Sequence, residues 1–324
     1  MRLAPEIPTV AAMELRSHDH DWDVLIIGRS FAGLSAALML GRARRSVLLV
    51  GTGGPRNEAV LHAHGLLTHD GASPGEILAA GEAQLARYPN VQVLDARVTG
   101  LEHAPPGTPG FLADLGGRPA SARAVVLATG VNDDPPPIPG LADHWGRGVF
   151  TCPFCDGWEH QDQPLSVVGD PAFGPHVAQL LRSGWSDRVT LFVGTLDEEV
   201  AEGLRERGVV VDEREVVRVH GDGDAVEELE LADGDRVPVG AIFVAKMPVA
   251  NTALAVGLGA ALDEVGLVVT DEQRSTTVPG LFAVGDVRTR MHQMSMAIAD
   301  GTMAGAAATA LLLSELLPVA DDAP

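Results

Sequence analysis

Both cysteines of this 324-residue chain lie in one short segment, TCPFCDGWE at residues 151–159. Cys152 and Cys155 form a Cys-x-x-Cys pair, and Asp156 directly follows the second thiol. Tetrahedral zinc needs four ligands, but the sequence has no second cysteine pair and no histidine pair of zinc-site spacing after His160. A disulfide closing so short a loop would stabilise the fold little. The pair therefore favours redox chemistry.

Thiol–disulfide exchange suits this spacing because the second thiol is held beside the first and the pKa of a thiol is low in such turns. Asp156 could move the proton that exchange releases, provided that its pKa is raised or that a water relays the proton. Alternatively, Asp156 is the N-cap of a helix that begins near Gly157.

A glycine turn follows the first apolar run, in the sequence IIGRSFAG. Gly28 and Gly33 stand at the outer positions of the G-x-G-x-x-G dinucleotide turn, where the first permits the tight turn and the last lets helix pack on strand. Ser30 takes the middle position. Its Cβ narrows the approach of a diphosphate, whereas its hydroxyl could donate a hydrogen bond to one.

Alternating strands and helices must position these residues. Apolar runs at residues 24–27, 46–50 and 124–130 predict buried strands, and FAGLSAALMLGRA predicts a helix between the first two. Such a βαβ start favours a parallel sheet. The proline-rich VNDDPPPIPG that follows suits neither a helix nor a central strand, so we expect the chain to cross into another domain there.

A second βαβ unit begins at Leu165, with strands in LSVVGD, RVTLFVG and GAIFVAK and a helix in HVAQLLRSG. GLFAVGD then predicts another strand, and a long apolar helix runs from about Met294 to Leu317. The predicted fold class is α/β, with two Rossmann-like nucleotide-binding domains. The second domain carries the cysteine pair and is inserted into the first. The expected bounds are a flexible tail at 1–20, the first domain at 21–133 and 248–324, and the inserted domain at 134–247.

The chain is strongly acidic, with a formal net charge of −21 and a pI near 4.7. Such a surface repels phosphate backbones and anionic lipid, so we expect neither nucleic acid nor a membrane as partner. No apolar run is expected to reach the ~18 residues of a membrane span, and the N-terminal segment lacks an apolar stretch of signal-peptide length. These features predict a cytoplasmic protein, in which structural disulfides are rare.

The turn of the second βαβ unit, VVGDPAFGPH, is a poor diphosphate site. Asp170 places a carboxylate where phosphates would lie, and Pro171 and Pro175 each remove a backbone N–H from the turn. The next strand is followed by the acidic residues 197–199 and not by arginines that would bind a 2′-phosphate. NADPH is therefore disfavoured, and NADH less strongly so. Alternatively, Asp170 only caps the following helix.

From Asp21 onward, four features resemble the thioredoxin reductase family of flavoproteins in order and spacing. They are the Gly28 turn, VVLATG, the Cys-x-x-Cys pair in the second domain, and VPGLFAVGDV. The resemblance implies an FAD-binding first domain in which Asp286 binds the ribityl–phosphate region. It also implies that Cys155 faces the flavin and that Cys152 exchanges with substrate. One departure is Gly51, which stands where Rossmann turns often carry an acid for the adenosine ribose.

The residues that this resemblance assigns to FAD follow the predicted strands or begin the last helix. Arg56 suits a diphosphate electrostatically, or else it is a solvated loop charge. The assigned residues are Gly28, Ser30, Phe31, Ala32, Gly33, Gly51, Thr52, Arg56, Asn57, His64, Val98, Ala128, Thr129, Gly130, Gly285, Asp286, Gln293 and Met294.

The wider segments CPFCDGWE and RNEAVLHAHGLLTHDG are similar to one branch, the FAD-dependent dithiol oxidases that close the disulfides of holomycin, gliotoxin and romidepsin. This resemblance implies oxidation of a small dithiol, with O₂ reduced to H₂O₂ and no need for NADPH. It makes His64 a flavin neighbour and His292 a candidate base. Asp156 departs from the branch, which often has histidine there.

We therefore expect an FAD-dependent dithiol oxidase that acts on a small natural-product dithiol, without a metal and as a homodimer. Cys152, Cys155, Asp156 and His292 are the candidate catalytic residues. One alternative is a thioredoxin-type disulfide reductase fed by NAD(P)H or another electron donor. Another is a non-catalytic flavin redox sensor. Trp145 and Trp158 are expected to pack in the core or an interface.

Overall fold

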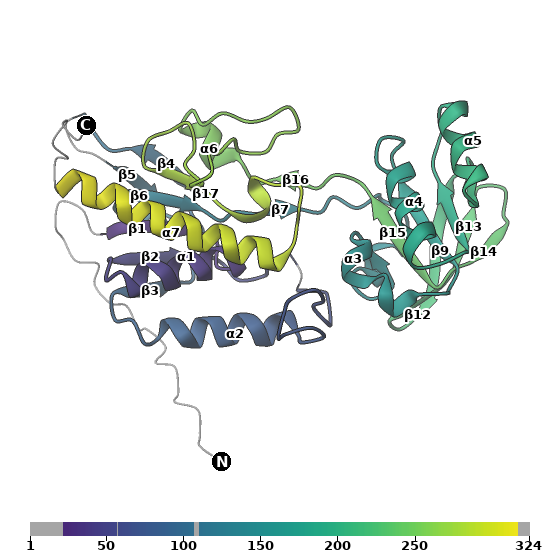
Figure 1. The fold of residues 1–324 in the computed structure, drawn as a ribbon, viewed down its shortest axis with the longest axis horizontal. Helices are drawn as coiled ribbons and strands as arrows, with labels where there is room; N and C mark the ends of the chain where they lie inside the picture. Colours follow the sequence, from purple (N-terminus) through teal and green to yellow (C-terminus); the bar gives the residue numbers. More distant parts are fainter. Residues whose placement is uncertain (1–21, 57, 107–109, 317–324) are drawn as a thin grey trace, which may run out of the picture. The chain divides into compact units, whose positions relative to one another are not determined.

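The computed structural model describes residues 22–56, 58–106 and 110–316. These form two compact units, each α/β with a parallel-stranded sheet, which confirms the predicted fold class (Figure 1). The first unit contains residues 22–55, 75–132 and 250–316, and the second contains residues 56–74 and 133–249. The second unit therefore includes a segment, residues 56–74, that lies within the expected first domain.

The first unit is built on a seven-stranded sheet of order β3-β2-β1-β6-β5-β4, in which β17 also pairs with β6. Strands β1, β2, β3, β6 and β17 are parallel, whereas β5 pairs antiparallel with both β4 and β6. The strands are β1 Trp22–Ile27, β2 Val47–Val50, β3 Val91–Leu94, β4 Gly100–His103, β5 Phe111–Asp114, β6 Pro119–Leu127 and β17 Leu281–Ala283.

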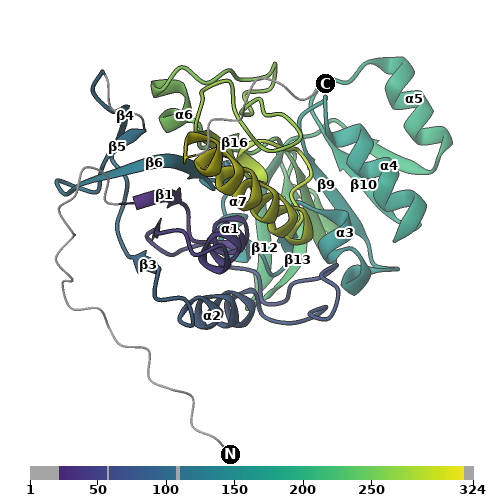
Figure 2. The same cartoon turned by 60° about the vertical axis from the view of Figure 1, so that its left-hand side comes forward.

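Successive side chains of β1 point to opposite faces of this sheet, as the pleat requires. Val24 and Ile26 join the core beneath α1 and α7, while Leu25 and Ile27 join the core on the other face. Figure 2 shows α1 and α7 lying along one face of the sheet. The helices of this unit are α1 Phe31–Arg42, α2 Pro74–Leu85, α6 Ala253–Gly257, the 3₁₀ helix Gly285–Val287 and α7 Met294–Leu316.

Helix α7 contains a window, Met294–Leu313, that is long and apolar enough to cross a membrane. This corrects the expectation that no apolar run reaches that length. The helix packs along α1, where the Ser35 hydroxyl donates to the Ile298 carbonyl at 2.7 Å. Ala304, Ala308 and Leu312 are fully buried in the core beneath it. Core helices of this kind pass the same length test, and the cytoplasmic location remains a prediction.

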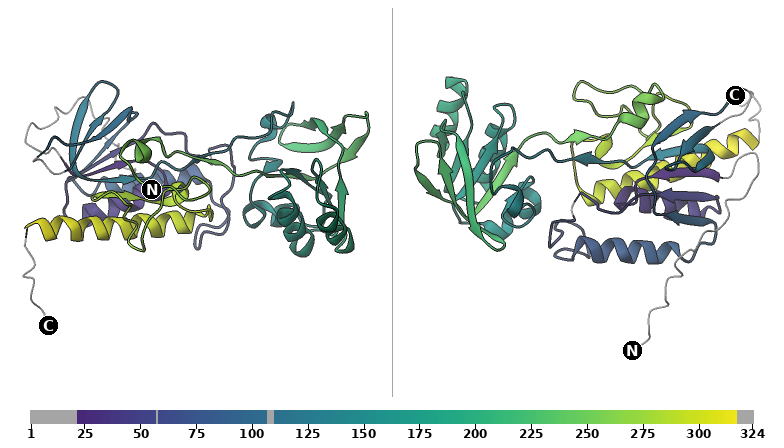
Figure 3. Two further views of the ribbon diagram at one scale, coloured as in Figure 1. Left: turned by 90° about the horizontal axis from the view of Figure 1, so that it is seen from above. Right: turned by 180° about the vertical axis from the view of Figure 1, so that it is seen from behind.

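The second unit has three layers. Its five-stranded parallel sheet, of order β11-β10-β9-β15-β8, packs one face on α4 and α5 and the other on an antiparallel sheet, β12-β13-β14 (Figure 3). The sequence analysis did not predict that antiparallel sheet. The elements are β8 Val149–Phe150, α3 Pro153–Asp156, β9 Leu165–Gly169, α4 Gly174–Gly184, β10 Val189–Phe192, α5 Glu198–Glu206, β11 Val209–Asp212, β12 Val216–Asp222, β13 Ala225–Leu231, β14 Arg236–Pro238 and β15 Ala241–Ala245.

Two short strands lie where the chain crosses between the units near residues 132 and 249. β7 Val131–Asn132 and β16 Val249–Ala250 pair with each other as a two-stranded sheet. The remaining short elements, both in the second unit, are the 3₁₀ helices Ala142–His144 and Trp158–His160.

Candidate functional site

The two cysteines form a disulfide, with Cα atoms 5.3 Å apart. Strand β8 ends at Phe150, and Cys152 is the N-cap of the short helix α3. Pro153 takes the first helical position, where its missing N–H costs no hydrogen bond. The Cys155 N–H donates to the Cys152 carbonyl at 3.1 Å. The disulfide therefore lies just beyond the carboxyl end of an edge strand of the parallel sheet.

Asp156 is the last residue of α3, so the alternative that it is the N-cap of a helix near Gly157 is wrong. Burial, and secondarily the negative charge of Glu159, raise the pKa of Asp156 to about 7. A carboxyl group with this pKa can both donate and accept a proton near neutral pH. Asp156 directly follows Cys155, and its raised pKa is what proton transfer during thiol exchange requires.

Further titratable side chains gather around Glu159, which is part of the 3₁₀ helix after α3. His64 Nε2 lies 3.5 Å from Glu159 Oε1, and His64 Nδ1 lies 3.7 Å from Asp70 Oδ1. Burial lowers the pKa of His160, whose ring centroid is 5.0 Å from that of Phe150. His64 belongs to the second unit and lies nearest to Glu159 among the carboxylates around it; its place as a flavin neighbour stays a prediction.

Two large aromatic side chains beside the disulfide are exposed. Phe154, between the cysteines, is 66% exposed, and Trp158 is 68% exposed. The Phe154 ring meets that of Trp185 edge-on, with centroids 5.6 Å apart. Trp158 does not pack in the core of the second unit, which contradicts that part of its prediction. Trp145 is half-buried and packs against a core cluster of the unit.

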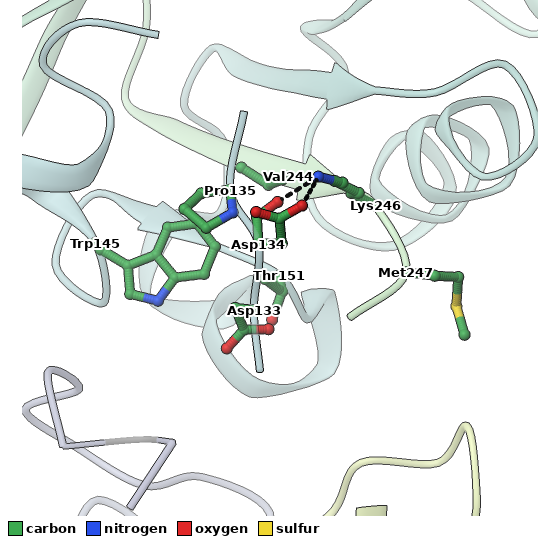
Figure 4. Close-up of a pocket in the computed structure, with 8 residues that line it drawn as sticks. All are labelled: Asp133, Asp134, Pro135, Trp145, Thr151, Val244, Lys246 and Met247. Carbon is green, nitrogen blue, oxygen red and sulfur yellow. Dashed lines mark hydrogen bonds and ion pairs between the residues drawn. The ribbon is translucent and has the colours of Figure 1, made fainter. Parts of the chain in front are cut away.

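A small open hollow lies next to the cysteine segment, and Figure 4 shows the residues that line it: Trp145, Thr151, Asp133, Asp134, Pro135, Val244, Lys246 and Met247. Lys246 Nζ pairs with Asp134 across it at 2.5 Å. Arg56 binds the neighbouring Asp133 through two contacts, of 2.6 and 2.8 Å. Arg56 is thus paired with a carboxylate of the second unit and is not simply a solvated loop charge, and its place at the diphosphate stays a prediction.

The first glycine turn follows β1 closely. A Cβ at Gly28 would lie 2.0 Å from the Ala128 carbonyl oxygen, and the backbone there has φ +116°, so only glycine fits. A Cβ at Gly33 would lie 1.8 Å from the Gly28 carbonyl oxygen. Ser30 is the N-cap of α1 in extended conformation, and its side chain makes no cap hydrogen bond. The turn has the compact form that dinucleotide binding requires.

Two more predicted segments end parallel strands at the same edge of the sheet as β1. Ala128, Thr129 and Gly130 follow β6, and Gly285 and Asp286 follow β17. Asn251, which the sequence analysis missed, binds the first of these segments. Its side chain donates to the Thr129 carbonyl at 2.9 Å, and its backbone N–H donates to the Gly130 carbonyl at 3.0 Å.

The remaining predicted residues of the first unit lie as follows. Gly51 directly follows β2 and packs so closely on Arg29 that a Cβ would lie 2.7 Å from that side chain. Thr52 is exposed, and Val98 is half-buried against the sheet core. His292, Gln293 and Met294 are half-buried at the start of α7. Asn57 lies outside the described residues.

These segments fit a dinucleotide cofactor. Ligands of open α/β sheets bind outside the carboxyl ends of the strands, and the predicted loops after β1, β2, β6 and β17 all lie at that edge. The turn after β1 has a helix N-terminus for a diphosphate, free of acidic residues in its first turn.

The corresponding turn of the second unit is different. Asp170 Oδ1 accepts hydrogen bonds from the backbone N–H groups of Ala172 and Phe173, both at 3.0 Å. Pro171 and Pro175 supply no N–H to this turn. After β10, Asp197 caps α5 by accepting from the N–H groups of Glu199 and Val200. The amide donors of both turns are thus bound to carboxylates of the protein itself.

Comparison with known proteins agrees with this architecture. The model of the family described as "Pyridine nucleotide-disulphide oxidoreductase" matches residues 22–301. The chain belongs to this family. It is a thioredoxin reductase-like flavoprotein oxidoreductase, as the resemblance predicted.

Several relatives in this family are similar over nearly the whole chain. The solved structure of HlmI is 35% identical with a TM-score of 0.85, covering 91% of this chain and 93% of that one. An oxidoreductase from Agrobacterium tumefaciens is 36% identical with a TM-score of 0.82, covering 92% and 99%. Thioredoxin reductase aclD of Aspergillus oryzae is 29% identical, covering 87% and 94%.

One match is partial. A protein of Arthroderma benhamiae described as "Probable thioredoxin reductase" is 43% identical over 157 residues, and this match spans 47% of the present chain and 38% of that protein.

Proposed function

We propose that this oxidoreductase is an FAD-dependent dithiol oxidase, which converts two thiols of one small molecule into an intramolecular disulfide and reduces O₂ to H₂O₂. The observation that carries the proposal is the Asp170 turn. A carboxylate of the protein is bound to the N–H groups that would receive the diphosphate of a pyridine nucleotide. An electron source other than NAD(P)H is then needed, and the disulfide offers an entry for electrons from a dithiol.

The first step is thiol–disulfide exchange at Cys152. A substrate thiolate attacks Cys152 Sγ, the Cys152–Cys155 bond breaks, and Cys155 leaves as a thiolate. The second substrate thiolate then attacks the substrate sulfur of the mixed disulfide, and Cys152 leaves. The substrate has lost two protons and two electrons, and the cysteine pair holds the electrons. The bound FAD would take these two electrons and pass them to O₂.

Asp156 is proposed to receive protons from the substrate thiols. Its pKa of about 7 leaves a substantial fraction ionised at neutral pH, as a base for a thiol requires. Glu159 contributes to this pKa, and His64 contacts Glu159. His292 stays a second candidate base. It belongs to the first unit and directly precedes Gln293 and Met294, which are proposed to bind FAD.

The proposed FAD site uses the residues at the carboxyl edge of the first sheet and the start of α7. The Gly28–Gly33 turn would hold the diphosphate at the N-terminus of α1, and Asp286 would bind the ribityl–phosphate region. Arg56 and His64 belong to the second unit by their contacts, and their places beside the flavin stay part of the proposal. We further propose that the protein is a cytoplasmic homodimer.

A disulfide reductase is the second candidate, since Asp156 after the pair is the reductase-like choice and several relatives are named thioredoxin reductases. Oxygen consumption separates the two. The purified protein is given a small dithiol in air without nucleotide. The oxidase is expected to form one disulfide and one H₂O₂ for each O₂ consumed. A protein that consumes no O₂ until NADH or NADPH is added would be a reductase.

A further inference from the structure

A buried ion network lies in the first unit, among residues to which no role has been assigned. Asp300 of α7 is fully buried, at 0% exposure. Its Oδ1 accepts from Arg274 Nε at 2.6 Å, and its Oδ2 accepts from Arg288 Nη1 at 2.9 Å. A carboxylate this deep is stable only when it is paired and hydrogen-bonded.

The same carboxylate holds the turn after β17. The Gly285 N–H donates to Asp300 Oδ2 at 3.1 Å. Gly285 has φ +71°, and a Cβ there would lie 3.1 Å from the Cβ of Ala32. Asp300 therefore fixes a left-handed turn that packs directly on the first glycine turn.

Helix α7 is anchored at the same point. Gly301 follows Asp300, and a Cβ at Gly301 would lie 2.1 Å from the Ala32 carbonyl oxygen. Three segments thus meet at Ala32: the turn after β1, the turn after β17, and α7. All three carry residues proposed to bind FAD, since α7 begins at Met294.

Both arginines make further hydrogen bonds besides those to Asp300. Arg274 adopts φ +70°, a region that non-glycine residues rarely occupy, and its carbonyl accepts from the Ala283 N–H at 3.0 Å. Arg288 also donates from Nε to the Thr270 hydroxyl at 2.7 Å. Strained backbone persists where the surroundings over-determine it, and such strain clusters at ligand sites.

We propose that Asp300, held between Arg274 and Arg288, is the positioning residue that sets the Gly285–Asp286 turn for the flavin. The proposal rests on the proposed FAD function. Without the carboxylate charge, both guanidinium groups lose their buried counter-ion and the Gly285 amide loses a charged acceptor. The turn then relaxes, and the protein releases the flavin faster.

Asp300→Asn tests this, because it removes the charge and keeps the side-chain shape. The holoprotein is diluted, and released flavin is followed by its fluorescence. We expect release about tenfold faster or more, the factor that corresponds to weakening one buried charged hydrogen bond. Arg288→Met, which leaves Asp300 its other partners, serves if the first variant does not fold, and it should speed release in the same direction.

Asp23→Asn is the matched control. Asp23 pairs with Arg123 at 3.5 Å and accepts from the Ser46 N–H at 2.9 Å, at the amino end of β1 and away from the proposed cofactor edge. It should lower the melting temperature without changing release. If Asp300→Asn folds and releases flavin at the wild-type rate, the inference is overturned. If that variant does not fold, an unchanged release rate in Arg288→Met overturns it. A wild-type protein that carries no flavin overturns the proposed function as well.

Discussion

Asp170 accepts a hydrogen bond from the backbone N–H of Phe173 at 3.0 Å, in the turn where a Rossmann domain usually binds a diphosphate. A fixed carboxylate there repels phosphate as well as blocking its donors. Two unit charges 4 Å apart cost about 4 kcal/mol at an effective dielectric of 20. The second unit keeps the nucleotide-binding fold, and we propose that its turn no longer binds a diphosphate.

Asp170→Ala should allow measurable NADH binding. The substitution frees the N–H groups of Ala172 and Phe173 and removes the like charge, so NADH affinity should rise about tenfold or more. Calorimetric titration of wild type and variant measures it. Asp263→Ala, in the first unit, removes a carboxylate that likewise accepts from two backbone N–H groups, those of Val265 and Leu267, and it should leave NADH affinity unchanged. Micromolar binding by the wild type would contradict this account of the turn.

Cys155→Ser should lose dithiol oxidation. The variant has no disulfide for a substrate thiolate to attack, so turnover should fall by about a thousandfold or more. Its Cys152 thiolate can attack an added linear disulfide such as oxidised glutathione and release one glutathione thiolate, so mass spectrometry should find the mixed disulfide on Cys152. Steady dithiol turnover by Cys155→Ser would refute the assigned roles.

The rate of dithiol oxidation should rise with pH through about 7. Asp156 acts as a base only when ionised, and its pKa is raised to about 7. Asp156→Asn should remove this limb from the pH profile of kcat/KM. Glu159→Gln should move the limb to lower pH, because Glu159 contributes to raising that pKa. Glu206→Gln, on the exposed surface of α5, is the control. If the rise of kcat/KM with pH persists in Asp156→Asn, it belongs to another group, such as His292.

Asp156→Asn should also stabilise the disulfide form at high pH. The pKa of Asp156 is about 7 in the folded protein, against 3.8 for an ordinary aspartate in the unfolded chain. Because the unfolded chain loses its proton at lower pH, the free energy of unfolding falls as the pH rises between these two values. The gain in the variant is absent below about pH 4 and reaches at most about 4 kcal/mol above pH 7. Urea unfolding at pH 5 and pH 8 measures it, with the exposed Asp187→Asn as control. An equal gain at both pH values would contradict the raised pKa.

Much of the fold could be predicted because parallel strands buried on both faces are continuous apolar runs. The strands β2, β9, β10, β15 and β17 lie within predicted segments, and β1 and β6 overlap theirs but begin two and five residues earlier. The antiparallel strands were missed because they alternate buried and exposed residues in charged surroundings, as β13 does with AVEELEL.

The residues of the candidate site also fall into those that the sequence predicted and those that it did not. The glycine turns and the cysteine pair were predictable because their spacing is local. Arg56 and His64 were linked to the flavin by the family resemblance; their contacts group them with the second unit, and the link to the flavin stays a prediction. Asn251 and Asp300 gave no local signal, since each acts on a segment distant in sequence: Thr129 for one, and Gly285 with both arginines for the other.

An anaerobic titration of the flavin absorbance tests the central claim most directly. The purified holoprotein is mixed in separate experiments with a small dithiol such as dithiothreitol, with NADH, and with NADPH. We predict that the dithiol bleaches the flavin band, that both nucleotides leave it unchanged, and that admitting air restores it with formation of H₂O₂. Rapid bleaching by either nucleotide would contradict the account, because electrons would then enter through the turn that Asp170 occupies.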